Sequence, residues 1–265
     1  MKLTKREKRK FSLMGLIVIT LIMVMGIGIV GVVAPKALAV LPLIGIALGI
    51  AYAEGNYLSD VLLKEADDRV SREKVTVISG QNLLIGAIVG KITKALGAIT
   101  ADADNTGNGT CTGVTMGADA LLGTYTIECI TAVENGGKFK VINPLGNALP
   151  DATVAVAYVN DQINFTVNDG ATDFIVGDKF TIVVGAGSGK VTQLAPAAIN
   201  GSQNAYGMLT SAIDASSADV EGVAIVRDAV LKSLGIVWPA GITEPQKAAA
   251  LAELEAKLVT TREGV

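Results

Sequence analysis

The side chains that usually carry enzyme chemistry are scarce in this sequence. It contains no histidine, and so it lacks the commonest general base and the commonest metal ligand of proteins. Its two cysteines, Cys111 and Cys129, are too few for a four-ligand zinc site. We expect them to be buried free thiols, and the alternative is a disulfide if their strands face each other. We therefore predict that the protein is not an enzyme, with no catalytic residues, no metal ligands and no cofactor.

Two short motifs resemble ligand-binding loops but lack residues that those loops need. Gly185 and Gly189 are separated by three residues where a P-loop has four, and Val191 follows Lys190 where a P-loop has Ser or Thr. Asp102 and Asp104 have the spacing of the first ligands of a calcium loop, but a glycine occupies the place of its bidentate glutamate. We interpret the first motif as a linker and the second as a solvated turn.

Charge is distributed unevenly along the chain. Residues 1–36 hold seven Lys or Arg and one Glu, which leaves 22 − 7 = 15 basic and 25 − 1 = 24 acidic residues in the rest. Residues 37–265 therefore carry a net charge of about −9, because these counts differ by that amount. Binding to nucleic acid requires clustered Lys and Arg, so we expect no nucleic-acid partner.

An apolar N-terminal segment follows a cluster of basic residues. Residues 11–33 contain no charged side chain, and as a helix this run can cross a bilayer core of roughly 30 Å. A second apolar stretch, residues 37–53, is interrupted by Pro42 and Gly45 and is marginal in length for another span. We predict a hydrophobic helical extension over residues 1–53, and residues 11–53 are the only segment that the sequence offers to a membrane.

Three other interpretations of this extension stay open. Ala37, Leu38 and Ala39 resemble the cleavage site of a signal peptide, although the apolar run before them is long for one. Residues 9–14 resemble the start of a type IV pilin, but Lys10 replaces the glycine expected before the cut and Gly15 replaces the expected glutamate. The third interpretation is an upstream reading frame joined to the protein that follows.

The composition of the chain after residue 53 predicts many short strands joined by tight turns. Aromatic residues make up only 4% of the sequence, and there are 30 glycines. Residues 54–74 are polar and charged, and we expect an extended or partly helical arm. Alternating patterns and turn residues predict strands at 75–80, 87–93, 110–116, 123–132, 138–143, 154–159, 163–167, 179–184, 206–210, 221–226 and 228–232, with a turn at 81–84.

One helix is predicted near the C-terminus. Thr243 is a good N-cap, and Gln246 stands three residues later as its reciprocal partner. The apolar side chains of Leu251, Leu254 and Leu258 are expected on one face of this helix, and Glu253 is expected to pair with Lys257. We expect Trp238, just before the helix, to be a core residue.

The order of these segments resembles the lambda-type head decoration proteins of tailed phages, the family of capsid-stabilising protein D. The resemblance covers about residues 56–262 and rests on residues 71–83, 86–93, 205–209, 223–229 and 238–241. The middle of the chain resembles a β module that recurs as an insertion in phage structural proteins, through residues 105–109, 123–125, 137–139, 165–170 and 174–180. No single motif is diagnostic, and the shared order makes the match.

This resemblance implies a mainly β fold with a defined domain organisation. A β-clip-like decoration domain is expected over residues 75–97 and 185–265, with one C-terminal helix. An inserted antiparallel β-sandwich module is expected over residues 98–184. A capsid-binding arm over residues 54–74 and the hydrophobic extension over residues 1–53 complete the chain.

The resemblance also implies a function. Family members bind the outside of the capsid as homotrimers and stabilise the shell against internal DNA pressure, so the implied partners are the major capsid protein and further copies of this chain, on the virion surface. The arm adds a strand to capsid protein, a contact that the resemblance assigns to Arg69, Val70, Ser71, Arg72, Glu73, Lys74, Val75 and Thr76. The alternative is a membrane-anchored or pilin-like protein of the bacterial inner membrane that displays a β-rich ectodomain.

Overall fold

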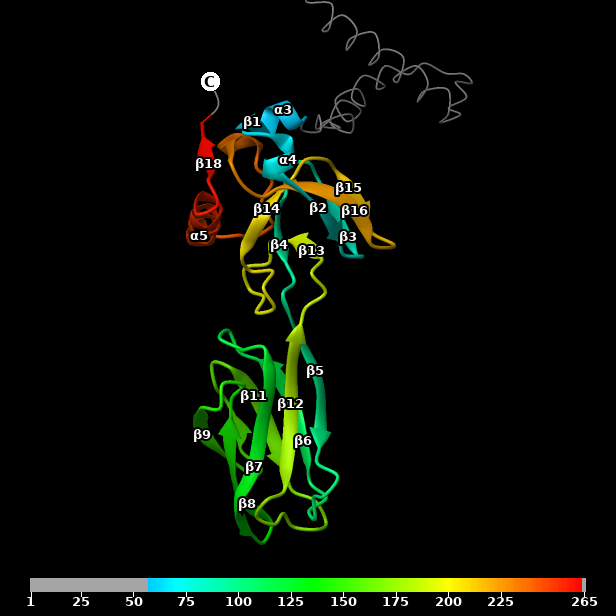
Figure 1. Ribbon diagram of the computed structural model, residues 1–265, viewed down its shortest axis with the longest axis vertical. Helices are drawn as coiled ribbons and strands as arrows, with labels where there is room; N and C mark the ends of the chain where they lie inside the picture. The colour runs from blue at the N-terminus through cyan, green and yellow to red at the C-terminus, as the bar shows by residue number, and fades with distance from the viewer. Residues whose placement is uncertain (1–56, 264–265) are drawn as a thin grey trace, which may run out of the picture. The chain divides into compact units, whose positions relative to one another are not determined.

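The computed structural model describes residues 57–263, which form mainly β structure with one long helix, α5 (Figure 1). The mainly β prediction with a single C-terminal helix is confirmed. The described residues belong to one compact unit, Glu54–Val265. The span, signal-peptide, pilin-like and fused-frame interpretations of residues 1–53 lie outside the described residues. Within residues 57–263, no helix is both long enough and apolar enough to cross a membrane.

Five strands form a closed barrel in the part of the chain predicted as the decoration domain. They are arranged in the order β13 (Val191–Gln193), β2 (Arg72–Val77), β16 (Val220–Ile225), β14 (Ala205–Leu209) and β4 (Ile88–Lys91). One set of side chains from these strands packs into a common core with β3 (Gln81–Leu83) and β15 (Ile213–Ala215), which pair with each other. The alternation of buried and accessible residues along β2 follows from the period of two of a strand.

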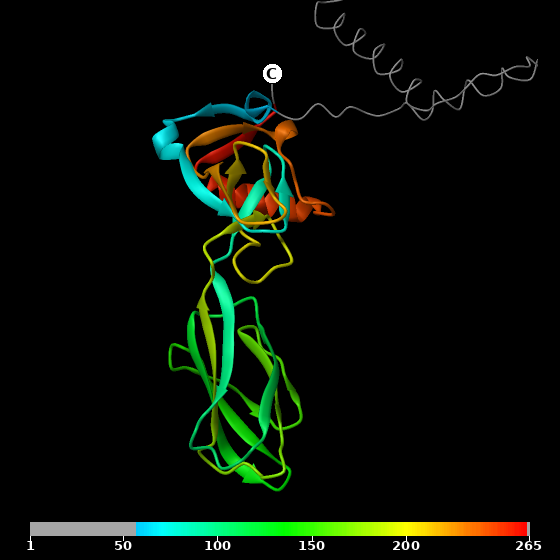
Figure 2. The same ribbon diagram turned by 90° about the vertical axis from the view of Figure 1, so that its right-hand side faces the viewer.

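A second apolar core joins the barrel to the C-terminal helix. Ile88, Met208 and Ile225 of the barrel strands pack there with Leu254 of α5 (Glu244–Glu255). β1 (Leu62–Glu65), β17 (Ala229–Lys232) and β18 (Val259–Arg262) form a three-stranded sheet in the order β1-β17-β18, and η2 (Ser233–Gly235) follows β17. α5 and β18, drawn in red, lie beside the barrel strands in Figures 1 and 2.

The part of the chain predicted as the inserted module forms two antiparallel sheets around one core. The larger sheet has the order β5 (Lys94–Ala101), β12 (Lys179–Ala186), β7 (Gly123–Val133), β8 (Gly136–Ile142) and β9 (Ala148–Thr153). The smaller sheet contains β10 (Ala157–Tyr158), β11 (Ile163–Asn168) and β6 (Thr110–Met116). The core contains the aromatic rings of the module, among them Phe139, Phe174 and Phe180, which contact one another at centroid distances of 5.0 to 6.2 Å.

The strands of the module begin earlier and end later than the sequence predicted. The module was expected over residues 98–184, but β5 starts at Lys94 and β12 ends at Ala186. These two residues pair with each other. The ladder between β5 and β12 therefore continues to the two connections with the barrel. The predicted strand at 154–159 is interrupted, because Ala155 has a left-handed backbone with φ of 60° between β9 and β10.

Two predictions, the turn at residues 81–84 and the helical position of Leu258, were wrong. Residues 81–84 were expected as a turn, but Gln81–Leu83 form β3 because they pair with β15. Leu258 was placed on the helix, but α5 ends at Glu255 and Leu258 is 66% exposed, with φ of 62°. The predicted Glu253–Lys257 pair is an interaction of charge without a direct ion pair: burial lowers the pKa of Lys257 and the charge of Glu253 partly offsets this. Both groups also bind the main chain of β14, since Glu253 accepts from Ala205 N–H and Lys257 donates to Ala205 O.

The predicted cap of the C-terminal helix is present. Thr243 is the N-cap residue, its N–H donates to Gln246 Oε1 at 2.9 Å, and Pro245 lies in the first turn. Leu254 is fully buried, while Leu251 and Trp238 are partly buried against the same core. The position of Trp238 agrees with the core role predicted for it.

Candidate functional site

The segment expected to bind a partner, Arg69–Thr76, forms the end of a short helix and most of β2. It follows α3 (Leu58–Val61), β1 and α4 (Asp68–Ser71). The Asp67 carboxylate caps α4 by accepting from Arg69 N–H at 2.9 Å. The preceding residues are thus partly helical, as predicted. They pack on the core beside the barrel, because Val61 is fully buried and β1 pairs with β17.

An ion pair fixes the position where α4 meets β2. Arg72 donates from its Nε to Glu65 Oε2 at 2.9 Å and forms a second bond to Glu65 Oε1. The buried Ser71 hydroxyl donates to the same carboxylate at 2.8 Å. The bond from Arg72 lowers the pKa of Glu65, and the bond to Glu65 raises the pKa of Arg72. A bidentate pair of this kind restricts both side chains, so β2 begins from a fixed point.

β2 is paired along its whole length on one side only. It runs antiparallel to β16, and Val226 N–H donates to Ser71 O at 2.9 Å at the start of this pair. Main-chain groups point alternately to the two sides of a strand. The odd-numbered residues of β2, such as Val75, therefore bond to β16. The N–H and C=O groups of the even-numbered residues, which are Arg72, Lys74 and Thr76, point to the opposite side.

The opposite side of β2 is open over most of its length. β13 approaches it only at Val77, where Val191 is the partner and Ile78 N–H donates to Val191 O at 2.9 Å. The N–H of Arg72 is used inside the helical turn, by donation to Asp68 O. No strand within residues 57–263 pairs with Lys74 on this side. Its N–H and C=O are therefore free to bond to an added strand, as an unpaired sheet edge allows.

The predicted residues are not all accessible. Ser71 and Val75 are buried, at 0% and 8% exposure, so neither presents its side chain to a partner. Arg69, Val70 and Lys74 are exposed, whereas the remaining predicted side chains are partly buried. This segment therefore offers a partner the unpaired main chain of β2, and only some of the eight predicted side chains are accessible.

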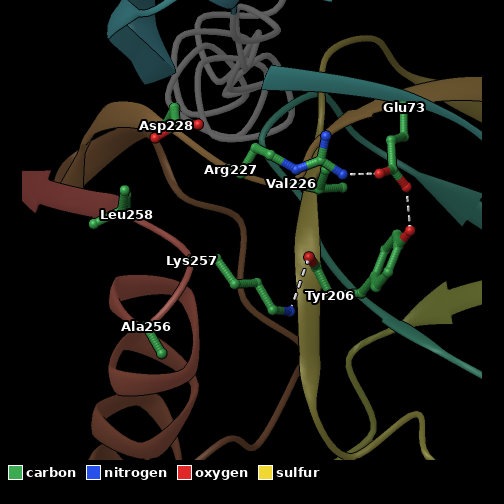
Figure 3. A pocket seen from close by; sticks show the side chains of 8 residues that line it. All are labelled: Glu73, Tyr206, Val226, Arg227, Asp228, Ala256, Lys257 and Leu258. Atoms are coloured by element: carbon green, nitrogen blue, oxygen red, sulfur yellow. Dashed lines mark hydrogen bonds and ion pairs between the residues drawn. The ribbon is translucent and has the colours of Figure 1, made fainter. Parts of the chain in front are cut away.

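A cavity of about 420 Å³ lies at the start of β2 (Figure 3). Glu73 forms an ion pair with Arg227 and accepts a hydrogen bond from the Tyr206 hydroxyl. Arg227 also donates to Val70 O at 2.9 Å. Lys257 donates to Ala205 O at 2.6 Å, and burial lowers its pKa. The cavity wall is thus a hydrogen-bonded network that holds Glu73, a predicted contact residue, in place.

Two residues of the cavity wall have a backbone that L-amino acids rarely adopt. Asp228 has φ of 50° and Leu258 has φ of 62°. Backbone bonds hold this arrangement, because Asp228 N–H donates to Lys257 O at 3.2 Å and Ala229 N–H donates to Leu258 O at 3.1 Å. A bulky residue such as Leu258 persists in this region only where its surroundings impose it.

Sequence reasoning missed the cavity network as a unit. Tyr206, Arg227 and Lys257 belong to separate parts of the chain, and only the fold brings them to Glu73. Tyr206 and Arg227 did stand in segments that carry the family resemblance, which was the only signal available. The spacing of these residues gave no sign of their contact.

Both cysteines are free and buried in the core of the inserted module. Burial raises the pKa of the Cys111 thiol to about 12 and also raises that of Cys129. A thiol with such a pKa is a weak nucleophile at neutral pH. Within residues 57–263, no three side chains of the types His, Cys, Asp and Glu are grouped closely enough to hold a metal ion.

Comparison with known proteins finds one family. The family model described as bacteriophage lambda head decoration protein D matches residues 51–259. No curated protein gives a significant match. Among solved structures, FlgL of Xanthomonas campestris is 17% identical, with a TM-score of 0.27 over 39% of this chain and 33% of FlgL. The flagellar hook junction protein FlgK of Burkholderia pseudomallei is 20% identical, with a TM-score of 0.27 over 44% of this chain and 21% of FlgK. This chain thus matches a third or less of each, and these scores give no basis for a shared fold.

Proposed function

This chain belongs to the bacteriophage lambda head decoration protein D family, which gives it a structural role in phage head decoration; we propose that it binds the outer surface of its phage's capsid as a homotrimer and stabilises the shell against the pressure of packaged DNA. The proposed partner is the major capsid protein. The proposed location is the surface of the virion.

We propose that the contact with capsid protein is strand addition to the open edge of β2, within Arg69–Thr76. The single observation that supports this most is the free main chain of Lys74, in a strand that is firmly held on its other side. An edge of this kind needs only an extended segment of a partner to complete its hydrogen bonds. The ion pair at Glu65 and the network at Glu73 also support the proposal. They hold β2 in place before a partner binds, so less conformational entropy is lost on binding.

The test is direct binding of the full-length chain to expanded, undecorated capsids of the same phage. Sedimentation of the capsids separates bound from free protein, and we expect saturable binding. Cryo-electron microscopy of the saturated particles is expected to show three copies around each local three-fold axis. DNA-filled particles that carry the protein should release their DNA at a higher temperature than bare particles. Absence of binding to expanded capsids would contradict the proposed function as a whole.

A further inference from the structure

The open edge of β2 also carries information about the segment that it accepts. We infer that this partner segment is a short extended strand with an acidic side chain facing Lys74 and an apolar side chain facing Val75. This inference rests on the proposed function, since it concerns the same edge. It adds the chemistry of the partner, which family membership does not supply.

The length of the segment follows from where pairing begins and ends. At one end, the N–H of Arg72 is bonded within α4. At the other end, Val191 already occupies the position beside Val77. A parallel pair at Val77 also uses the Thr76 C=O, so the unpaired main chain runs from the Arg72 C=O to the Thr76 N–H. At about 3.3 Å per residue it accommodates a strand of roughly three to five residues.

The charge of the segment follows from which side chains near the edge are already paired. Arg69–Thr76 contains three basic residues and one acid. Arg69 pairs with Asp67, Arg72 with Glu65, and Glu73 with Arg227. Lys74 is the one charged side chain of this segment that forms no ion pair with any of residues 57–263, and it is exposed.

The nearest carboxylate on the neighbouring strand does not neutralise Lys74. Glu221 stands opposite Thr76 on β16, which places it diagonally from Lys74 and on the side of β2 away from the open edge. No ion pair joins the two residues within the described structure. A strand added at the open edge would place a side chain directly beside Lys74, on the same face, where opposite charges stabilise a pair and like charges destabilise it.

The opposite face of the added strand meets a different surface. Val75 turns to the barrel core, where it packs with Val77 and Leu209, and it is 8% exposed. A residue of the partner on that face borders this apolar side chain, so a charged group there would lose water without gaining a partner. An acidic residue on one face of the added strand, followed by an apolar residue on the other face, is the alternation of a half-buried strand.

The first test uses a zero-length carbodiimide crosslinker, which joins an amine to a carboxylate in direct contact, on capsids saturated with the full-length chain. Mass spectrometry is expected to identify an amide bond between Lys74 and an Asp or Glu of the capsid protein. An apolar residue is expected directly next to that acid. The variant Lys74→Arg keeps the charge but lacks the amine, so it should bind normally and give no crosslink.

The second test compares two variants with the same change of charge. Lys74→Glu is expected to weaken capsid binding about fivefold, the upper range for one cross-strand charge pair. The control Lys138→Glu changes an exposed lysine on β8 of the inserted module and should bind as the wild type does. Circular dichroism of both variants verifies that each is folded.

The outcomes separate this inference from the proposed function. If the chain binds capsids but Lys74 forms no crosslink to an acid, or if Lys74→Glu binds as well as Lys138→Glu, the inference is overturned and the proposed function stands. If the wild-type chain does not bind expanded capsids, the proposed function itself is overturned. A crosslink at Lys74 together with a selective loss for Lys74→Glu supports both.

Discussion

Proline substitutions at two neighbouring positions of β2 test whether its edge is open. Proline has no N–H and is tolerated in a strand only where the N–H is unpaired. The N–H of Lys74 points to the open edge, whereas the N–H of Val75 points to Gly222 on β16. Lys74→Pro and Val75→Pro should therefore differ strongly although they are adjacent.

The expected magnitudes follow from what each proline removes. Val75→Pro removes a ladder hydrogen bond of a buried residue, and leaving its partner carbonyl unsatisfied costs about 1–3 kcal/mol. The proline ring would also push against Gly222, so we expect a total loss of about 3 kcal/mol or more in the free energy of unfolding. Lys74→Pro removes no main-chain hydrogen bond within residues 57–263, and we expect a change of less than about 1 kcal/mol.

Thermal unfolding followed by circular dichroism measures this difference. For a domain of this size, about 3 kcal/mol corresponds to a fall in Tm of roughly 6–12 °C. Lys74→Pro should stay within about 4 °C of the wild type. The control Lys74→Ala removes the same side chain but keeps the N–H, so it isolates the main-chain effect. Equal destabilisation by Lys74→Pro and Val75→Pro would refute the assignment of the free edge. If the edge is open, Lys74→Pro should fold but lose capsid binding.

Three further predictions concern the inserted module and the barrel. The buried Asp178 carboxylate accepts three backbone N–H bonds at 2.8 to 3.0 Å; burial raises its pKa, but these bonds outweigh burial and hold the pKa below its usual value. The stabilisation by the Asp178 carboxylate is therefore present above about pH 4 and is lost as pH falls through the lowered pKa. Asp178→Asn should lower the free energy of unfolding by about 2 kcal/mol at pH 7. The stability of this variant should also depend less on pH in the acid range. Iodoacetamide at pH 8 should leave Cys111 and Cys129 unlabelled in the folded protein and label both in denaturant, as mass spectrometry would show, because both thiols are buried. Gly90→Ala should destabilise the barrel by about 2 kcal/mol or more in a urea titration, because its Cβ would lie 2.0 Å from the backbone oxygen of Ser202; an unchanged midpoint would contradict that close approach.

The strands that the sequence predicted well are those with a local signal. In the inserted module, the strand expected at 110–116 is β6 within its predicted bounds, because turn residues limit it on both sides. The cap at Thr243 was also predictable, since a capping box is a pattern of two residues three apart. Local patterns of this kind need no knowledge of the rest of the fold.

Elements that depend on distant partners escaped prediction. Gln81–Leu83 contains no alternating apolar pattern and becomes a strand because β15, more than 100 residues later in the chain, pairs with it. Leu258 continues the helical spacing of Leu251 and Leu254, but the chain must turn into β18, which pairs with β17. Tertiary pairing overrides helical periodicity there.

The candidate site shows the same division. The sequence located the segment Arg69–Thr76 through its resemblance to the decoration family, and it could not say which of those residues face outward. That distinction depends on the register between β2 and β16, which a shift of one residue would reverse. Ser71 and Val75 were therefore named with Lys74 although both are buried.

The insertion of the module and the open edge of β2 have a common structural origin. β13 is the strand that closes the barrel against β2, and it follows directly after the module. The residues before Val191 bond to the other connection of the module, because Gly187 N–H donates to Thr93 O and Gly189 N–H donates to Ile92 O, both at 2.9 Å. These residues follow Ile92 and Thr93 instead of β2, so parallel pairing with β2 stops at Val77. Within residues 57–263, Lys74 therefore has a neighbouring strand only on the β16 side, and its other side is the edge that we propose for a partner.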